Sequence, residues 1–124
     1  MDDRSAIRAL QLAYGERFDA RDPEGFAALF TEDAVMVQPG GKEIRTLEKF
    51  RKSVRNMPPK GDGYHAMLET EIRIDGDHAS ARTRYQARSS FTGQEMTGHY
   101  ADEYRKTPEG WRFTRRAVFV DPAP

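Results

Sequence analysis

The period of the apolar residues changes part-way along this 124-residue chain, and that change constrains the fold more than any other feature. Before Gly63, most apolar side chains recur at spacings of three and four, which is typical of one face of a helix. After Gly63 the spacing becomes two, which is typical of strands with one buried face. Helices followed by a run of strands predict an α+β domain.

Three helices and one short strand are predicted in the first half of the chain. The helices are expected over residues 3–19, from 22 onward and from 46 to 57, with the strand at 34–38. The apolar face of the first helix consists of Ile7, Leu10, Tyr14 and Phe18. Asp22 and Thr46 can cap the second and third helices, because their side-chain oxygens accept hydrogen bonds from free backbone N–H groups.

Four antiparallel strands are predicted in the second half. They are expected at 64–75, 78–91, 95–106 and 111–120, and Asp75-Gly76-Asp77 is the clearest hairpin turn between them. On the first of these strands, one side should carry Ala66, Leu68, Thr70, Ile72 and Ile74. Such a meander predicts a curved, mostly antiparallel sheet wrapped around the N-terminal helices, with a cone-shaped cavity that can hold a small molecule.

Composition excludes several classes of function. The chain has 20 basic and 20 acidic residues, so no net charge favours nucleic acid or an acidic membrane as a partner. It has no cysteine, which excludes thiol nucleophiles and thiolate metal sites and fits a cytoplasmic protein. No apolar run is long enough to cross a membrane. We expect one domain over residues 1–124, and the apolar content of only 37% suggests a homodimer in which a second subunit covers part of the sheet.

One polar constellation is suited to chemistry: Tyr14, Asp19 and His65. An aspartate and a histidine together can move a proton, and a phenol can polarise a carbonyl or hold a leaving oxygen. Each residue also has a structural interpretation, as a core tyrosine, a helix-end aspartate and a strand-end histidine. His99 is a further candidate, although it alternates with Tyr100 and only one of the two can face the cavity.

No metal or cofactor site is expected from the pattern of the histidines. None of the 3 histidines has the spacing of a helix or finger ligand pair, and no cysteine is available. The basic residues in and around the third helix are best explained as a solvated face. The alternative is that these basic residues bind a carboxylate, a phosphate or a coenzyme A tail at the cavity mouth.

The order of elements and several short segments resemble the SnoaL-like branch of the nuclear transport factor two-like superfamily. The segments that carry the resemblance are Asp22-Pro23-Glu24-Gly25-Phe26-Ala27-Ala28-Leu29-Phe30, Thr31-Glu32-Asp33-Ala34-Val35, Asp75-Gly76-Asp77-His78-Ala79, Gly98-His99-Tyr100 and Gly110-Trp111-Arg112. The resemblance covers nearly the whole chain and implies the cone-shaped α+β fold. It implies less about function, because the superfamily holds isomerases, dehydratases, cyclases, epoxide hydrolases and non-enzymatic binders.

Two enzyme groups of the superfamily use different catalytic residues, which can be compared with this sequence. In ketosteroid isomerases the base is a carboxylate just before the proline that corresponds to Pro39, and Gln38 cannot serve there. Dehydratases of bile acids and scytalone, and a lindane dehydrochlorinase, use an aspartate at the end of the first helix and a histidine after the third. Asp19 and His65 resemble that pair. Tyr14 resembles a tyrosine of the bile acid enzymes, and His99 is the candidate for the second histidine of scytalone dehydratase.

The leading hypothesis is a cofactor-free lyase or isomerase, similar to a dehydratase, that acts on a small, hydrophobic, oxygenated substrate. The alternatives are a non-catalytic small-molecule binder, a polyketide cyclase-like protein and a dimeric assembly domain. In the last case, side chains such as Met67, Met96 and Trp111 would fill the cone.

Overall fold

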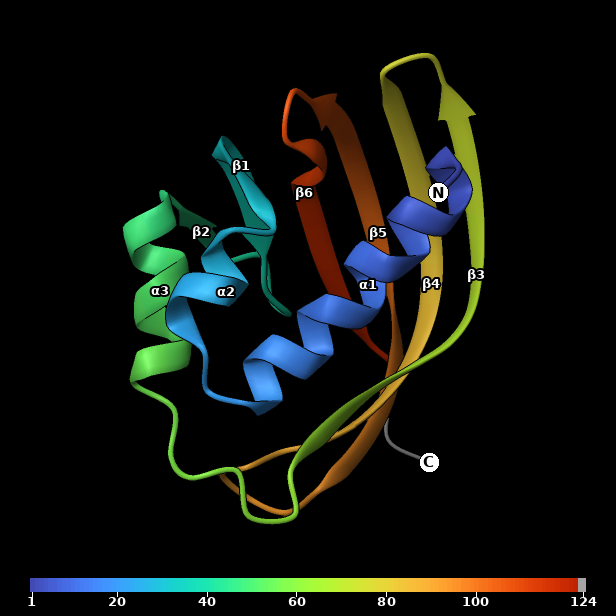
Figure 1. The fold of residues 1–124 in the computed structure, drawn as a ribbon. Helices are drawn as coiled ribbons and strands as arrows, with labels where there is room; N and C mark the ends of the chain where they lie inside the picture. The colour runs from blue at the N-terminus through green and yellow to red at the C-terminus, as the bar shows by residue number, and fades with distance from the viewer. Residues whose placement is uncertain (123–124) are drawn as a thin grey trace.

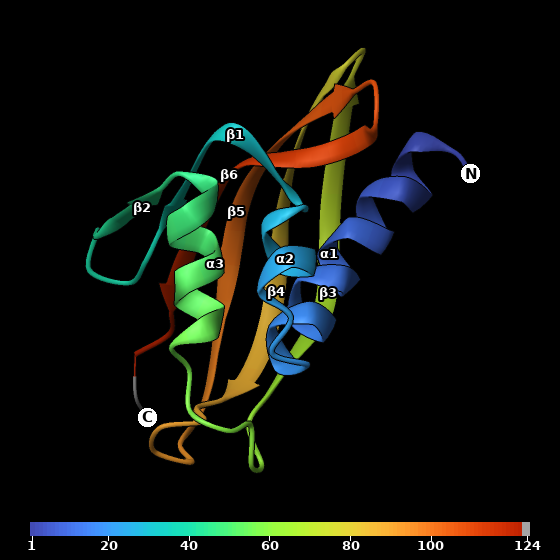
Figure 2. The same cartoon turned by 60° about the vertical axis from the view of Figure 1, so that its left-hand side comes forward.

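The computed structural model describes Met1–Pro122 and shows a curved, open six-stranded sheet with three helices on one side of it (Figure 1). The elements are α1 (Asp3–Asp19), α2 (Pro23–Ala27), β1 (Phe30–Val37), β2 (Glu43–Arg45), α3 (Leu47–Arg55), β3 (Tyr64–Asp75), β4 (His78–Arg88), β5 (Glu95–Thr107) and β6 (Gly110–Val120). Figure 2 shows the same layering from a second direction, with the long α1 packed across the sheet. The predicted α+β fold class is confirmed.

The second and third helices, α2 and α3, begin where capping side chains were predicted. Asp22 accepts a hydrogen bond from the Gly25 N–H at 2.9 Å, and Thr46 accepts one from the Lys49 N–H at 3.2 Å. Asp2 caps α1 in the same way. Each cap satisfies an N–H that the first helical turn leaves without a backbone partner.

The strand order in the sheet is β2-β1-β6-β5-β4-β3. The strands from β3 to β6 form the predicted antiparallel meander, whereas β1 pairs with β6 in parallel. The prediction did not include β2, whose three residues are too few to show a period. The sheet therefore contains one parallel pair, β1 with β6. Beside this pair, α3 packs against β1 and β2, and α2 packs against α3 (Figure 1).

An irregularity in β3 breaks the alternation that the sequence predicted. The pairing of β3 with β4 shifts register between Met67 and Thr70, and Leu68 is left 41% exposed. The expectation that Leu68 shares the buried side of Ile72 is therefore wrong, because the extra residue in the ladder changes the phase of the strand.

The core lies between the helices and the concave side of the sheet. Its fully buried centre consists of Ile7, Phe26, Phe50 and Phe113. Phe30 stacks on Phe113 with ring centroids 5.2 Å apart, which joins β1 to β6. Within Met1–Pro122, no helix is long and apolar enough to span a membrane.

Candidate active site

A cavity of about 180 Å³ lies between α1 and the sheet. It is lined by Gln11, Leu12, Tyr14, Gly15, Glu16, Asp19, His65, Ala66, Met67, Tyr100 and Arg116. The wall thus combines apolar surface with a few polar groups, as ligand sites commonly do. All three members of the predicted trio are among the lining residues.

Asp19 and His65 form a close pair at this cavity. The Nδ1 atom of His65 lies 2.8 Å from Oδ1 of Asp19, and the backbone N–H of His65 donates to Oδ2 at 2.9 Å. Both carboxylate oxygens are thereby engaged by one residue, which fixes the carboxylate relative to the ring. The side chains are 16% and 24% exposed, so the pair is sheltered but open to a ligand.

The pair forms where the last turn of α1 meets the first residues of β3. A Cβ atom added at Gly15 would lie 3.1 Å from Cβ of His65, which is tighter than ordinary contact. The absence of a side chain there lets the helix approach the strand closely. This approach brings the carboxylate of Asp19, one turn further along α1, to the imidazole of His65.

The electrostatics of Asp19 favour the ionised carboxylate. Burial raises its pKa, but the hydrogen bonds from the ring and backbone of His65 outweigh burial and hold the pKa below its usual value. The positive charge of Lys60 acts in the same direction. Asp19 is therefore suited to orient an imidazole and stabilise an imidazolium, rather than to carry a proton itself.

The hydroxyl of Tyr14 is available as a donor. Within residues 1–122 it donates to the sulfur of Met36 at 4.0 Å, which is a weak acceptor. Burial raises the pKa of Tyr14, opposed in part by the charge of Arg116, so the hydroxyl keeps its proton. The edge of its ring meets His65, with centroids 6.1 Å apart.

The structure places His99 away from this site. Tyr100 lines the cavity and is 5% exposed, whereas His99 lies on the opposite face of β5 and stacks on Phe119 at a centroid distance of 4.6 Å. Alternation along the strand requires this separation. The geometry brings Tyr14, Asp19 and His65 together and leaves His99 out.

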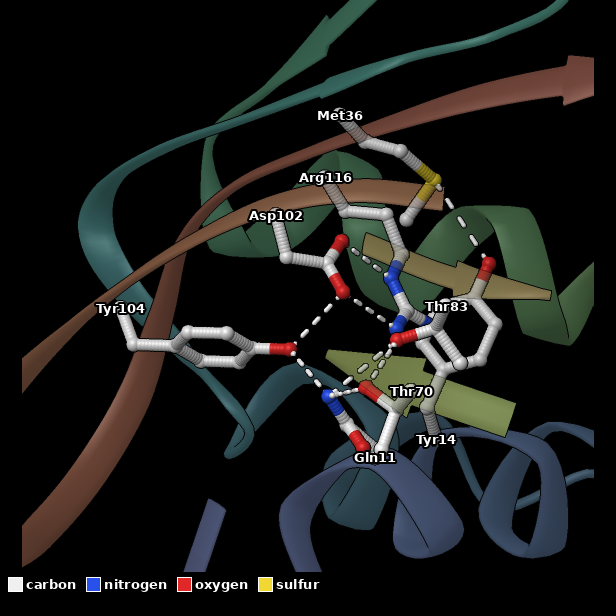
Figure 3. Close-up of polar contacts among 8 residues, drawn as sticks. All are labelled: Gln11, Tyr14, Met36, Thr70, Thr83, Asp102, Tyr104 and Arg116. Atoms are coloured by element: carbon white, nitrogen blue, oxygen red, sulfur yellow. Dashed lines mark hydrogen bonds and ion pairs between the residues drawn. The ribbon is translucent and has the colours of Figure 1, made fainter. Parts of the chain in front are cut away.

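A buried polar network that the sequence did not predict lies beneath the cavity (Figure 3). Arg116 donates from Nε and Nη2 to the two carboxylate oxygens of Asp102, each at 2.8 Å. Tyr104 donates to the same carboxylate at 2.8 Å and accepts from Nε2 of Gln11 at 3.1 Å. Arg116 and Gln11 also line the cavity, so the network forms part of its wall.

A signal for half of this network was present in the sequence. Tyr100, Asp102 and Tyr104 alternate on the buried face of β5, which marks Asp102 as an inward-facing acid. Arg116 is harder to find, because the register of β6 shifts between Phe113 and Arg115. Simple alternation after Trp111 and Phe113 would bury Arg115. Because of the shift, Arg116 faces inward instead.

The positive charge of the third helix is partly neutralised by a carboxylate of α2 and one of its own. Arg51 forms ion pairs with Glu24 and Glu48, and Arg55 forms one with Glu48. These pairs support the interpretation of a solvated helix face.

Comparisons with known proteins support the fold. The family model described as the SnoaL-like domain matches residues 1–117. The uncharacterised Mycobacterium tuberculosis protein Rv2910c is 26% identical over 126 residues, which cover 94% of this chain and 84% of that protein. An NTF2-like protein with a cystatin-like fold from Novosphingobium aromaticivorans superposes with a TM-score of 0.86 at 22% identity, covering 98% of this chain and 84% of the other.

A second structure from Novosphingobium aromaticivorans, provisionally assigned as a scytalone dehydratase, is similar with a TM-score of 0.83 at 21% identity. The match covers 96% of this chain and 84% of the other. At this level of identity the likeness establishes a common fold. Together with the family match over residues 1–117, it shows that the chain belongs to the SnoaL-like domain family and has the nuclear transport factor two-like fold.

Proposed function

We propose that the protein is a cofactor-free lyase or isomerase, similar to a dehydratase, in which Asp19 and His65 transfer a proton of a small hydrophobic, oxygenated substrate. The observation that carries this proposal is the double contact of Asp19 with the ring and backbone of His65, beside a cavity. Its likeness in fold to a provisional scytalone dehydratase is consistent with this class of reaction.

Nε2 of His65 is the nitrogen that would transfer the proton in this proposal. Because Nδ1 of His65 is engaged by Asp19, Nε2 is the nitrogen left for a substrate, and no residue of 1–122 is hydrogen-bonded to it. In the neutral ring, the Nδ1–H donates a hydrogen bond to the carboxylate and Nε2 carries the lone pair. Nε2 would take a proton from the carbon next to a carbonyl, and Asp19 would stabilise the imidazolium that forms.

Tyr14 would act on the oxygen side of the same reaction. Its hydroxyl would donate a hydrogen bond to the carbonyl oxygen while charge accumulates there. In an elimination, the electron pair of the broken C–H bond forms the new double bond, and the departing hydroxyl leaves as water after taking a proton from the imidazolium. In an isomerisation, the imidazolium returns its proton to another carbon.

The test begins with a screen of small cyclic hydroxy ketones for loss of water or a shift of the double bond, followed by mass spectrometry and absorbance. With a substrate in hand, His65→Ala should lower turnover by about 10²–10⁴-fold, because the base is lost. Asp19→Asn should also lower turnover, since the amide keeps the shape and removes the charge.

His78→Ala is the matched control, because His78 is exposed at the first position of β4. Turnover that survives both Asp19→Asn and His65→Ala would refute the mechanism. A substrate-like ligand that binds tightly and is never converted would favour the alternative, a non-catalytic binding module.

We also propose that two copies associate through the outer face of the sheet. The supporting observation is Phe119, a large aromatic side chain that is 47% exposed and stacks on His99 on this face. Charges of both signs, those of Arg82, Arg84 and Asp121, lie near the stacked His99. Two copies related by a two-fold axis can match such a mixture.

A further inference from the structure

The floor of the cavity contains a buried cation whose hydrogen-bonding capacity is incompletely used. Arg116 is 1% exposed, and its Nη1 atom has no hydrogen-bond partner among residues 1–122. The ordinary rule is that a buried donor is satisfied, so an exception of this kind calls for an explanation. The other two nitrogens of the guanidinium, Nε and Nη2, each donate one hydrogen bond to Asp102.

The ion pair of Arg116 and Asp102 is oriented with its positive end toward the cavity. Arg116 is a lining residue, whereas Asp102 lies behind it and does not line this cavity. The hydroxyl of Tyr104 donates to the carboxylate from the far side and offsets part of its charge. A ligand in the cavity is therefore closer to the guanidinium than to the carboxylate.

Aromatic rings hold the guanidinium in place and keep water away from it. Its central carbon lies 3.8 Å from the ring centroid of Tyr100, 4.3 Å from that of Tyr14 and 4.5 Å from that of Phe113. Electrostatic interactions are stronger in such surroundings than in water. Because Nη1 has almost no exposed surface, the charge acts on a ligand mainly through space rather than through a direct hydrogen bond.

The size of the cavity limits what can respond to this charge. An engineered apolar cavity of about 150 Å³ binds benzene, and the cavity described here measures about 180 Å³. A single ring with one or two substituents therefore fits. Asp19 repels negative charge on one side of the cavity and Arg116 attracts it on the floor, so an anionic substituent has one favoured direction.

We propose that the cavity floor is an oxyanion subsite, in which a carboxylate or enolate oxygen of a single-ring ligand lies over the positive end of the Arg116–Asp102 pair and beside the Tyr14 hydroxyl. This inference names the substrate class of the proposed enzyme and rests on the same cavity, but it does not require that Asp19 and His65 be catalytic.

The first test uses the unmodified protein. 4-Nitrophenol titrates near neutral pH and its anion absorbs visible light, so it serves as a probe for an enolate. Bound to the cavity, it should ionise at least tenfold more readily than in water. Benzoate, the probe for a carboxylate, should bind at least tenfold more tightly than benzamide in calorimetry. Preference for only one anion assigns the subsite to that kind of oxygen, and preference for neither overturns the proposal.

The second test removes the charge. Arg116→Met is combined with Asp102→Asn, because either change alone leaves an unpaired charge in the core. The asparagine oxygen can still accept from Tyr104. The double variant should lose the preference for anions and keep benzamide binding, and a preference that persists in the folded double variant would overturn the proposal.

Arg115→Met is the matched control, since Arg115 carries the same charge one residue away and lines a groove without touching the cavity. It should bind both anions as the parent does, and an equal loss in this variant would assign the effect to the overall charge and overturn the subsite.

Asp19→Asn separates the two proposals. Loss of turnover with anion preference retained supports both, whereas full turnover with anion preference retained refutes only the proton transfer.

Discussion

At the scale of single residues, the hydroxyl of Tyr14 separates function from stability. Among residues 1–122, the acceptor that this hydroxyl reaches is the weakly accepting sulfur of Met36 at 4.0 Å. Tyr14→Phe should therefore lower the free energy of unfolding by less than about 1 kcal/mol, while turnover falls about 10²-fold or more if the hydroxyl stabilises an oxyanion. Urea unfolding and steady-state kinetics on the same sample measure the two effects. A large loss of stability with unchanged turnover would assign Tyr14 to the core alone.

Asp19 makes a second prediction at this scale, for the dependence of stability on pH. Its pKa in the folded protein lies below the ordinary value of 3.8. A depressed pKa stabilises the folded state above the unfolded value, and this contribution is lost as the pH falls through the folded value. The stability difference between the parent and Asp19→Asn should thus shrink below about pH 4. A difference that grows on acidification would contradict the assigned direction.

The buried arginine shows why part of the site escaped the sequence analysis. A charged residue on a strand is usually exposed, so the sequence alone does not predict that Arg116 is buried. Only the register shift in β6 turns it inward, and this shift depends on pairing with β5 rather than on any local pattern. Asp19 and His65, in contrast, could be proposed because their positions follow from the end of a helix and the start of a strand.

At the scale of elements, the close approach of α1 to β3 sets the geometry of the candidate pair. Gly15→Ala should favour the helix by about 1 kcal/mol, but the added carbon would lie 3.1 Å from Cβ of His65. We expect the helix and strand to separate slightly, so that turnover falls while the free energy of unfolding changes little. Arg8→Ala, on the exposed side of the same helix, controls for helix propensity. Unchanged turnover in Gly15→Ala would show that the pair tolerates displacement.

Elements with a strong local period were predicted well, and elements defined by pairing were not. The bounds of α1 and β3 match the expected ranges, because each is long enough for its apolar residues to repeat several times at a helical or strand spacing. The parallel pairing of β1 with β6 and the register shift in β3 arise from contacts between distant segments. Periodicity within one segment contains no information about them.

At the scale of the whole molecule, the proposed dimer gives a direct prediction. The protein should sediment as a dimer at micromolar concentration, and Phe119→Glu should convert it to a monomer, because a charge would be buried at the centre of the interface. Phe91→Glu is the control, since Phe91 is 70% exposed in the turn between β4 and β5, beyond the ends of both strands. A parent protein that sediments as a monomer would refute the proposed association.

The parallel pairing of β1 with β6 has a consequence for the order in which the molecule can form during synthesis. Phe30 begins β1, yet the strand it stacks against, which carries Phe113, leaves the ribosome about eighty residues later. Until β6 has been synthesised, the helices and β1 therefore expose apolar surface, while the strands from β3 to β5 can already pair with one another. Because β6 also carries Arg116, the strand that completes the core is the one that completes the cavity floor. A nascent chain halted before β6 would have neither, so a chaperone that shields β1 is most needed in that interval.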